Sequence, residues 1–232
     1  MQSYIQEKKA VFKGNVGKFA IFAGLALLGY GFYISLKRDA STVSLLIILA
    51  SVGTIITQVG SILFAKYGQN PRPDQVLDES LKGLSSSHSL FHYALNTDHA
   101  LLGPAGAVAV IAYQANGTVT YENGGYYVRG GGGLFGGGRK KKLRGIEKTI
   151  MRKVRELDKA LRWAFPDRDD IEVQPLLIFV NEKNKVEADS APVQTAHAQK
   201  AKNAFKRLPR KAGFSQEEIE AIAAKRGFTV SD

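Results

Sequence analysis

The sequence predicts an α+β protein in which a two-helix transmembrane hairpin precedes a mixed α/β domain and a helical C-terminal tail. Two charge-free apolar stretches, within residues 19–65, are each about as long as the roughly 20 residues that cross a bilayer. Farther along, short runs rich in Val and Ile alternate with glycine-containing turns, as in β-strands. Amphipathic helical periodicity flanks these strands on both sides.

The hairpin consists of residues 19–36 and 43–65, joined by the link 37–42. Two alternatives compete with it: a cleaved signal peptide, or a pair of buried helices in a soluble protein. The first stretch ends in Tyr30-Gly31-Phe32-Tyr33, which lacks a small-x-small cleavage site, and a second span follows. Two such runs back to back favour membrane spans over buried helices. We therefore expect an integral membrane protein that contacts the lipid bilayer directly.

Basic residues near the spans predict the orientation. Lys8, Lys9, Lys13 and Lys18 lie in the basic N-terminal segment 1–18, and Lys66 and Arg72 follow the second span; the link holds Lys37 and Arg38. Because Lys and Arg favour the cytoplasmic side, we expect both termini and the soluble domain to be cytoplasmic. The absence of cysteine suits that reducing compartment.

Small residues recur on both predicted spans, namely Ala20, Gly24, Gly31, Gly53, Thr57 and Ser61. Such residues let helix backbones approach closely in lipid. Three interpretations remain open: ordinary membrane composition, packing within the hairpin, and oligomerisation.

After a breaker-rich linker at 66–73, the soluble part is predicted in order as follows. Asp74 opens an amphipathic helix with Leu77, Leu81 and Leu84 on one face. Strands are expected at 90–95, 99–103, 107–113, 118–122 and 126–129, which together form a curled antiparallel meander, and Asn123-Gly124-Gly125 between the last two is a hairpin signal. A glycine-rich basic loop at 130–142 lacks the end of a phosphate-binding Walker loop and has the composition of a flexible linker. Then come a helix at 145–165, a strand at 172–180, a polar stretch at 186–193, and helices at 196–208 and 215–226. The predicted boundaries are a domain at 74–195 and a tail at 196–232.

Positive charge gathers at the start of the helix predicted at 145–165. The exposed candidates for polyanion binding are Arg139, Lys140, Lys141, Lys142, Arg144, Lys148 and Arg152. A solvated helix face, nucleic-acid phosphate and anionic lipid headgroups are the three interpretations of this run. The four histidines lack the spacing of metal ligands, so no metal site and no cofactor is expected from them.

A resemblance to a known family depends on residues 98–106, which read Asp-His-Ala-Leu-Leu-Gly-Pro-Ala-Gly. This stretch resembles the Asp-His-x-x-x-Gly-Pro-x-Gly motif of the nuclease-related (NERD) domain, with Gly117 at that family's later glycine. Asp74 stands where its helical acid is expected. The resemblance covers roughly residues 74–181 and implies a restriction-endonuclease-like, PD-(D/E)XK-type fold with Asp98 and Asp74 as remnants of a catalytic site.

The same resemblance implies that the family's catalytic Glu and Lys are replaced in this chain. With Gly106 and Gly117 in register, Ile111 replaces the family's Glu and Tyr113 replaces its Lys. Metal-assisted phosphodiester cleavage needs oxygen ligands for Mg²⁺ or Mn²⁺, and isoleucine supplies none. We therefore expect a membrane-anchored pseudoenzyme that acts as a binding or scaffolding module at the cytoplasmic membrane face. Its ligand would be anionic lipid, nucleic acid or a protein partner.

Two alternatives stay open. One is a membrane-tethered nuclease that uses Mg²⁺ or Mn²⁺ and recruits other acids such as Glu122 or Glu147. The other is an accessory subunit of a larger membrane complex, for which the hairpin would be the docking surface.

Overall fold

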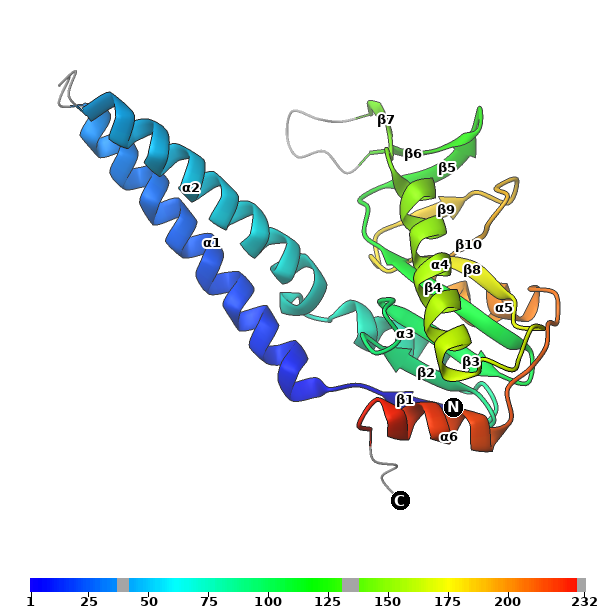
Figure 1. Cartoon of the computed structure of the whole chain (residues 1–232). Helices are drawn as coiled ribbons and strands as arrows, with labels where there is room; N and C mark the ends of the chain where they lie inside the picture. The colour runs from blue at the N-terminus through cyan, green and yellow to red at the C-terminus, as the bar shows by residue number, and fades with distance from the viewer. Residues whose placement is uncertain (37–41, 131–137, 229–232) are drawn as a thin grey trace. The chain divides into compact units, whose positions relative to one another are not determined.

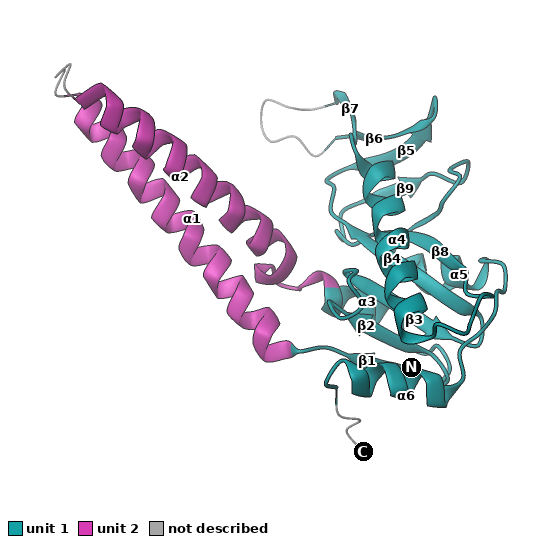
Figure 2. Cartoon of the chain, viewed as in Figure 1, with its two compact units in different colours: residues 1–6, 74–232 teal, residues 7–73 magenta. Residues whose placement is uncertain are grey.

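The computed structural model describes residues 1–36, 42–130 and 138–228 and divides the chain into two compact units (Figure 2). Residues 7–73 form a helical unit, and residues 1–6 and 74–232 form a mixed α+β unit. The helical unit is therefore inserted between the first residues of the mixed domain and the rest of it, instead of following an independent N-terminal segment.

Two long helices make up the helical unit. α1 spans Glu7–Ser35 and α2 spans Val43–Leu63, which continues as a π-helix, η2, at Phe64–Gly68. Both are long and apolar enough to cross a membrane. α1 begins at Glu7, so its 29 residues extend over about 43 Å and include the turns that carry the predicted basic segment. The predicted link 37–42 lies outside the described residues except for its last residue.

Glycines allow α1 and α2 to pack closely along this unit. A Cβ atom placed on Gly24 would lie 2.7 Å from the carbonyl oxygen of Gly53, and one on Gly60 would lie 2.7 Å from the backbone nitrogen of Ile21. Real Cβ atoms essentially never approach so closely. Packing within the hairpin, one of the three interpretations left open above, therefore accounts for the glycines at these positions.

The mixed domain contains a six-stranded sheet in the order β1-β2-β3-β4-β8-β10 (Figure 1). The strands are β1 (Gln2–Tyr4), β2 (Ser89–His92), β3 (His99–Gly103), β4 (Gly106–Tyr113), β8 (Val173–Phe179) and β10 (Gln194–His197). β2, β3 and β4 form an antiparallel meander, whereas β1, β8 and β10 run parallel to their neighbours.

A second sheet has the order β7-β6-β5-β9. Its strands are β5 (Thr118–Glu122), β6 (Gly125–Arg129), β7 (Lys140–Lys142) and β9 (Lys185–Glu187). The predicted hairpin at Asn123-Gly124 is confirmed: both residues have positive φ, 48° and 69°, as a type I′ turn requires. The hairpin does not continue the meander, as the sequence suggested, because β5 and β6 pair with β9 and β7 in a separate sheet.

Helices cover both faces of the six-stranded sheet. They are α3 (Pro73–Leu81), α4 (Ile146–Ala164), a 3₁₀ turn η3 (Ala198–Lys200), α5 (Ala201–Lys206) and α6 (Gln216–Lys225). Alternate residues of β4 lie on opposite faces of the sheet and belong to two separate cores. Ala109 and Ile111 pack with α4 and α6, whereas Val108 and Val110 pack with α3 and α5. The result is a three-layer domain.

The predicted boundary at residue 195 falls within β10 and separates two core helices from the rest of the unit that contains them. Phe205 of α5 and Ile219 of α6 are buried in the two cores. The predicted helix at 196–208 begins as strand β10, which pairs with β8 from Leu176 to Phe179. α6 begins with a capping box between Ser215 and Glu218.

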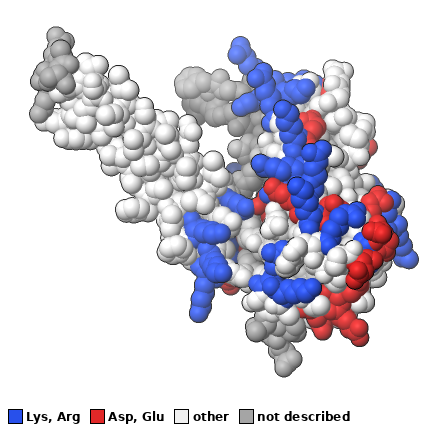
Figure 3. Space-filling model, in the orientation of Figure 1, with Lys and Arg blue, Asp and Glu red and all other residues white. Residues whose placement is uncertain are grey.

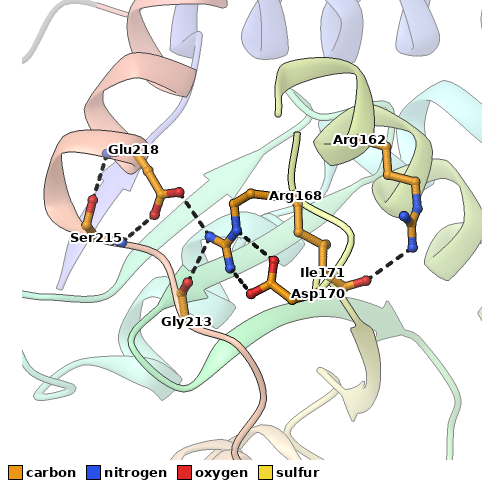
Figure 4. Close-up of polar contacts among 7 residues, drawn as sticks. All are labelled: Arg162, Arg168, Asp170, Ile171, Gly213, Ser215 and Glu218. Carbon is orange, nitrogen blue, oxygen red and sulfur yellow. Dashed lines mark hydrogen bonds and ion pairs between the residues drawn. The ribbon is translucent and has the colours of Figure 1, made fainter. Parts of the chain in front are cut away.

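Arg168, in the turn after α4, connects that turn to α6 (Figure 4). Its guanidinium donates to Glu218 at 3.0 Å, to the carbonyl of Gly213 at 3.0 Å, and to Asp170 at 2.7 Å. It also lies over the ring of Phe214 at 4.9 Å. These carboxylates raise the pKa of Arg168 above its ordinary value, Asp170 making the larger contribution. The charge-assisted contacts fasten the predicted tail to the domain.

Candidate functional site

Asp98, the central acid of the predicted remnant site, ends a tight loop between β2 and β3. Tyr93 opens this loop with a positive φ of 58°, and its backbone N–H donates to the carbonyl of Asp98 at 2.7 Å. A bulky residue in the left-handed region is uncommon and costs free energy, so the surrounding contacts must hold it.

Lys153, from the middle of α4, contacts the Asp98 carboxylate. Its Nζ lies 3.3 Å from Asp98 Oδ2 and 2.8 Å from Glu156 Oε2. The lysine side chain is only 13% exposed, and the two carboxylates are about one-third exposed. One ammonium therefore bridges two carboxylates at the interface between the loop and α4.

Asp74, the other predicted remnant, lies in the first turn of α3 and is 1% exposed. The hydroxyl of Tyr93 donates to its Oδ1 at 3.2 Å. Tyr93 thus bonds to both predicted acids, to Asp98 through its backbone and to Asp74 through its side chain. The structure brings the two acids to the same residue.

A pair of buried histidines lies beside Tyr93. The Nδ1 atoms of His92 and His99 are 2.7 Å apart, and His92 Nε2 lies 3.1 Å from Asp78 Oδ1. In a neutral His92, donation from Nε2 to Asp78 leaves Nδ1 to accept from His99. Among the described residues, no group of three or more His, Asp or Glu side chains is placed to hold a metal ion.

Ile111 and Tyr113 lie on the face of β4 that packs with α4. Ile111 is 5% exposed in that core, and the Tyr113 ring meets Phe179 edge-on with centroids 5.6 Å apart. Burial raises the pKa of the Tyr113 phenol above its ordinary value, so the side chain stays neutral at physiological pH. Neither position presents a carboxylate or a cation.

Backbone geometry explains the glycines of the motif. Gly106 and Gly117 have φ values of 114° and 117°, which side chains rarely adopt. A Cβ atom on Gly103 would lie 2.6 Å from the His88 ring, so the backbone needs glycine there too. The part of the motif that shapes turns is therefore explained without any catalytic role.

The predicted polyanion-binding residues form one exposed surface along β7 and α4. All seven are exposed: Arg139, Lys140, Lys141, Lys142, Arg144, Lys148 and Arg152. Figure 3 shows basic side chains along β7 and α4, with only a few acidic ones between them. Arg129 joins this surface because β6 pairs with β7 and places it opposite Lys140. We call these eight residues the basic surface.

Strand pairing and side-chain contacts hold the basic residues of β7 in place. Lys140 ion-pairs with Glu122 and lies over the Tyr127 ring at 4.6 Å, and Lys142 lies over the same ring at 5.9 Å. Lys140–Lys142 thus form a strand, whereas the sequence suggested the end of a loop; residues 131–137 of that loop lie outside the described residues. On α4, a shallow groove of about 580 Å³ includes Lys148, Arg152 and the half-exposed Met151.

Sequence reasoning missed Lys153 and Glu156 as partners of Asp98. Their spacing of three residues on α4 was visible, but only tertiary packing places them beside the loop at residues 93–98. Glu122 and Glu147, which the sequence suggested as recruited acids, lie elsewhere: Glu122 pairs with Lys140, and Glu147 is in the first turn of α4.

No family model, curated protein or solved structure matches this chain.

Proposed function

We propose that this protein is a membrane-anchored, non-catalytic module that binds a polyanion through the basic surface. The observation that carries the proposal is the run of exposed Lys and Arg side chains from β6 and β7 along α4 (Figure 3). A surface of one charge sign held on two rigid elements attracts phosphate groups of either lipid or nucleic acid.

The membrane anchor would be the α1–α2 unit. β1 precedes this unit and pairs with β2, which follows it, so both ends of the hairpin enter the same domain. Only two residues separate β1 from α1, and four separate η2 from α3. With Lys8, Lys9, Lys13 and Lys18 on the first turns of α1, the domain would be cytoplasmic.

The fold within this proposal is the restriction-endonuclease-like one. Its support is the order of elements: helix α3, the antiparallel meander β2-β3-β4, helix α4, and β8 parallel to β4. The sequence resemblance predicts this same order of helix, meander, helix and strand.

The contacts of Asp98 and the residues on β4 support the proposed lack of catalysis. Lys153 ion-pairs with Asp98, while Ile111 and Tyr113 offer neither a metal ligand nor a positive charge. A hydrolytic metal site needs several oxygen ligands around one ion.

Binding measured with the full chain in nanodiscs of zwitterionic lipid would test the proposal. The probes are duplex DNA and vesicles that contain anionic phospholipid. Replacing Arg144, Lys148 and Arg152 by Gln should weaken binding at least tenfold, at about 1 kcal/mol per residue near an anionic surface. Wild-type binding should also weaken steeply as salt is added.

A matched control has the same change in charge on the opposite side of the sheet. Lys200, Lys206 and Arg207 lie on or beside α5 and are exposed. Their replacement by Gln should leave binding nearly unchanged. Equal losses in both variants would mean that net charge alone drives binding, and a wild-type chain that binds neither probe at low salt would contradict the proposal.

A metal-dependent nuclease is the second candidate, and one observation favours it. Lys153 and Glu156 place a lysine and a second carboxylate at Asp98, although both come from α4 and not from β4. Cleavage of plasmid or single-stranded DNA with Mg²⁺ or Mn²⁺ that disappears in Asp98→Ala and Lys153→Ala, but persists in Lys206→Ala, would establish this candidate over the first.

A further inference from the structure

Polar side chains form a stripe on one face of α2. Thr54 lies three and four residues before Thr57 and Gln58, and Ser61 lies three and four residues after Gln58 and Thr57, so the four share one side of the helix. Together with Leu28 and Ile62 they line a shallow groove of about 410 Å³. Gly53 and Gly60 pack against α1 on an adjoining side of α2, and Thr57 borders that side, because a Cβ atom on Gly24 of α1 would meet its Oγ1.

Two members of this stripe satisfy their hydroxyl donors within the helix. Thr57 Oγ1 donates to the carbonyl of Gly53 at 2.7 Å, and Ser61 Oγ donates to the carbonyl of Thr57 at 2.8 Å. The side chains of Thr54 and Gln58 are exposed and make no hydrogen bond to any part of the chain that the structure describes. Two donors and an acceptor of the Gln58 carboxamide are therefore available.

In a bilayer, the depth of Gln58 makes it costly in free energy to leave its amide without hydrogen-bond partners. Gln58 is fifteen positions after Val43 and five before Leu63, about 22 Å and about 8 Å along the helix axis. In a helix that crosses the bilayer, both distances place the amide inside the hydrocarbon. There an amide without a partner loses several kcal/mol relative to water.

We propose that α2 docks against α2 of a second copy of this chain, with Gln58 hydrogen-bonded to Gln58 across a two-fold axis along the bilayer normal. This inference rests on the membrane crossing proposed above. Two copies inserted in the same direction place identical residues at identical depth, and such an axis brings them face to face. A carboxamide both donates and accepts, so it is complementary to itself. Any other partner helix would need its own polar group at this depth.

Cysteine cross-linking of the full chain in membranes would test the pairing, because the natural sequence contains no cysteine. Single Thr54→Cys and Ser61→Cys variants place a thiol on the polar stripe. Val59→Cys is the matched control, because Val59 is 50% exposed, adjacent to Gln58 in depth, and about 100° around the helix from it. On oxidation, the two stripe variants should form covalent dimers and the control should not. Adding Gln58→Leu to Thr54→Cys should weaken dimerisation roughly three- to fifteenfold, as expected for one hydrogen bond between membrane helices.

Carbonate extraction of the same membranes separates the two possible failures. A chain that stays in the pellet but cross-links equally at residues 54, 61 and 59, or at none of them, overturns the pairing and leaves the anchor intact. A chain released into the supernatant overturns the anchor and the pairing together. Unchanged dimerisation in the Gln58→Leu variant would also overturn the role of the amide.

Discussion

Lys153 Nζ lies 3.3 Å from Asp98 Oδ2, and this contact joins the middle of α4 to the loop between β2 and β3. The same ammonium lies 2.8 Å from Glu156. Tyr113 lies on β4, whereas the lysine in contact with Asp98 comes from a helix.

We expect Lys153→Ala to destabilise the domain by about 1–3 kcal/mol, because it leaves two partly buried carboxylates without their shared cation. Lys148→Ala is the control, since Lys148 is exposed on the same helix. Thermal unfolding of the full chain in mild detergent can be followed by the fluorescence of Trp163, the only tryptophan. A midpoint no lower than that of the control would mean that the contact has no stabilising role.

The position of β1 predicts how the soluble domain can be isolated. Tyr4 is 6% exposed and stacks on Phe91 with ring centroids 4.7 Å apart, so a chain that starts at Asp74 loses part of its core and exposes the edge of β2. A variant in which a short Gly-Ser linker replaces residues 7–73 retains β1. A short linker suffices because Arg72 and Glu7, at the two ends of the excised unit, form an ion pair at 3.2 Å.

We expect the linked variant to be soluble and to unfold cooperatively, and the chain that starts at Asp74 to be less stable or aggregated. Urea unfolding and size-exclusion chromatography of both variants would measure this difference. Equal midpoints for the two would show that β1 adds nothing to the domain.

The elements that could be predicted from the sequence are those whose signal is local. The apolar stripe predicted a helix at 145–165, and α4 spans Ile146–Ala164. The Asn123-Gly124 turn predicted the hairpin formed by β5 and β6. β1 has only three residues, too few for a periodic signal, and it pairs with a strand beyond the inserted hairpin. β10 precedes an alanine-rich helix, and its pairing with β8 overrides the local preference for helix.

The residues of the candidate site also fall into those with a local sequence signal and those whose contacts depend on tertiary packing. Gly103, Gly106 and Gly117 could be identified from the sequence, because turn geometry requires those residues locally. The contact of Asp98 with Lys153 could not, because it depends on the packing of α4 against a loop that is distant in the sequence. The basic surface was visible as a run of charge, but Arg129 joined it only through the register of β6 and β7.

Packing of α1 against α2 predicts different effects for two glycines on α1. A Cβ atom on Gly24 would lie 2.7 Å from the Gly53 carbonyl oxygen, whereas one on Gly29 would have nothing within 4 Å. We expect Gly24→Val to destabilise the hairpin by about 1–3 kcal/mol through overpacking, and Gly29→Val to leave it nearly unchanged. The SDS fraction at which the helical circular dichroism signal is half lost measures both. If the two variants have the same midpoint, this close approach is not stabilising.

His88 predicts a dependence of stability on pH. Its Nδ1 lies 2.9 Å from Ser85 Oγ, and its ring meets Phe205 edge-on with centroids 5.4 Å apart. Burial lowers the pKa of His88, and the nearby amino group of Met1 lowers it further, while a hydrogen bond to Ser85 partly opposes the shift. The unfolded chain, with a His pKa of about 6.5, therefore binds a proton more readily than the folded one.

The contribution of His88 to stability is accordingly complete above about pH 6.5 and is lost progressively as the pH falls below that value. We expect the free energy of unfolding to fall less between about pH 7.5 and about pH 5 in His88→Gln than in the wild-type chain, because glutamine does not titrate there. Urea unfolding of the full chain in mild detergent at each pH, followed by Trp163 fluorescence, gives the two slopes. Carboxylates titrate equally in both chains, so their effects cancel in the difference. Parallel slopes would mean that His88 has the same pKa in the folded and unfolded states.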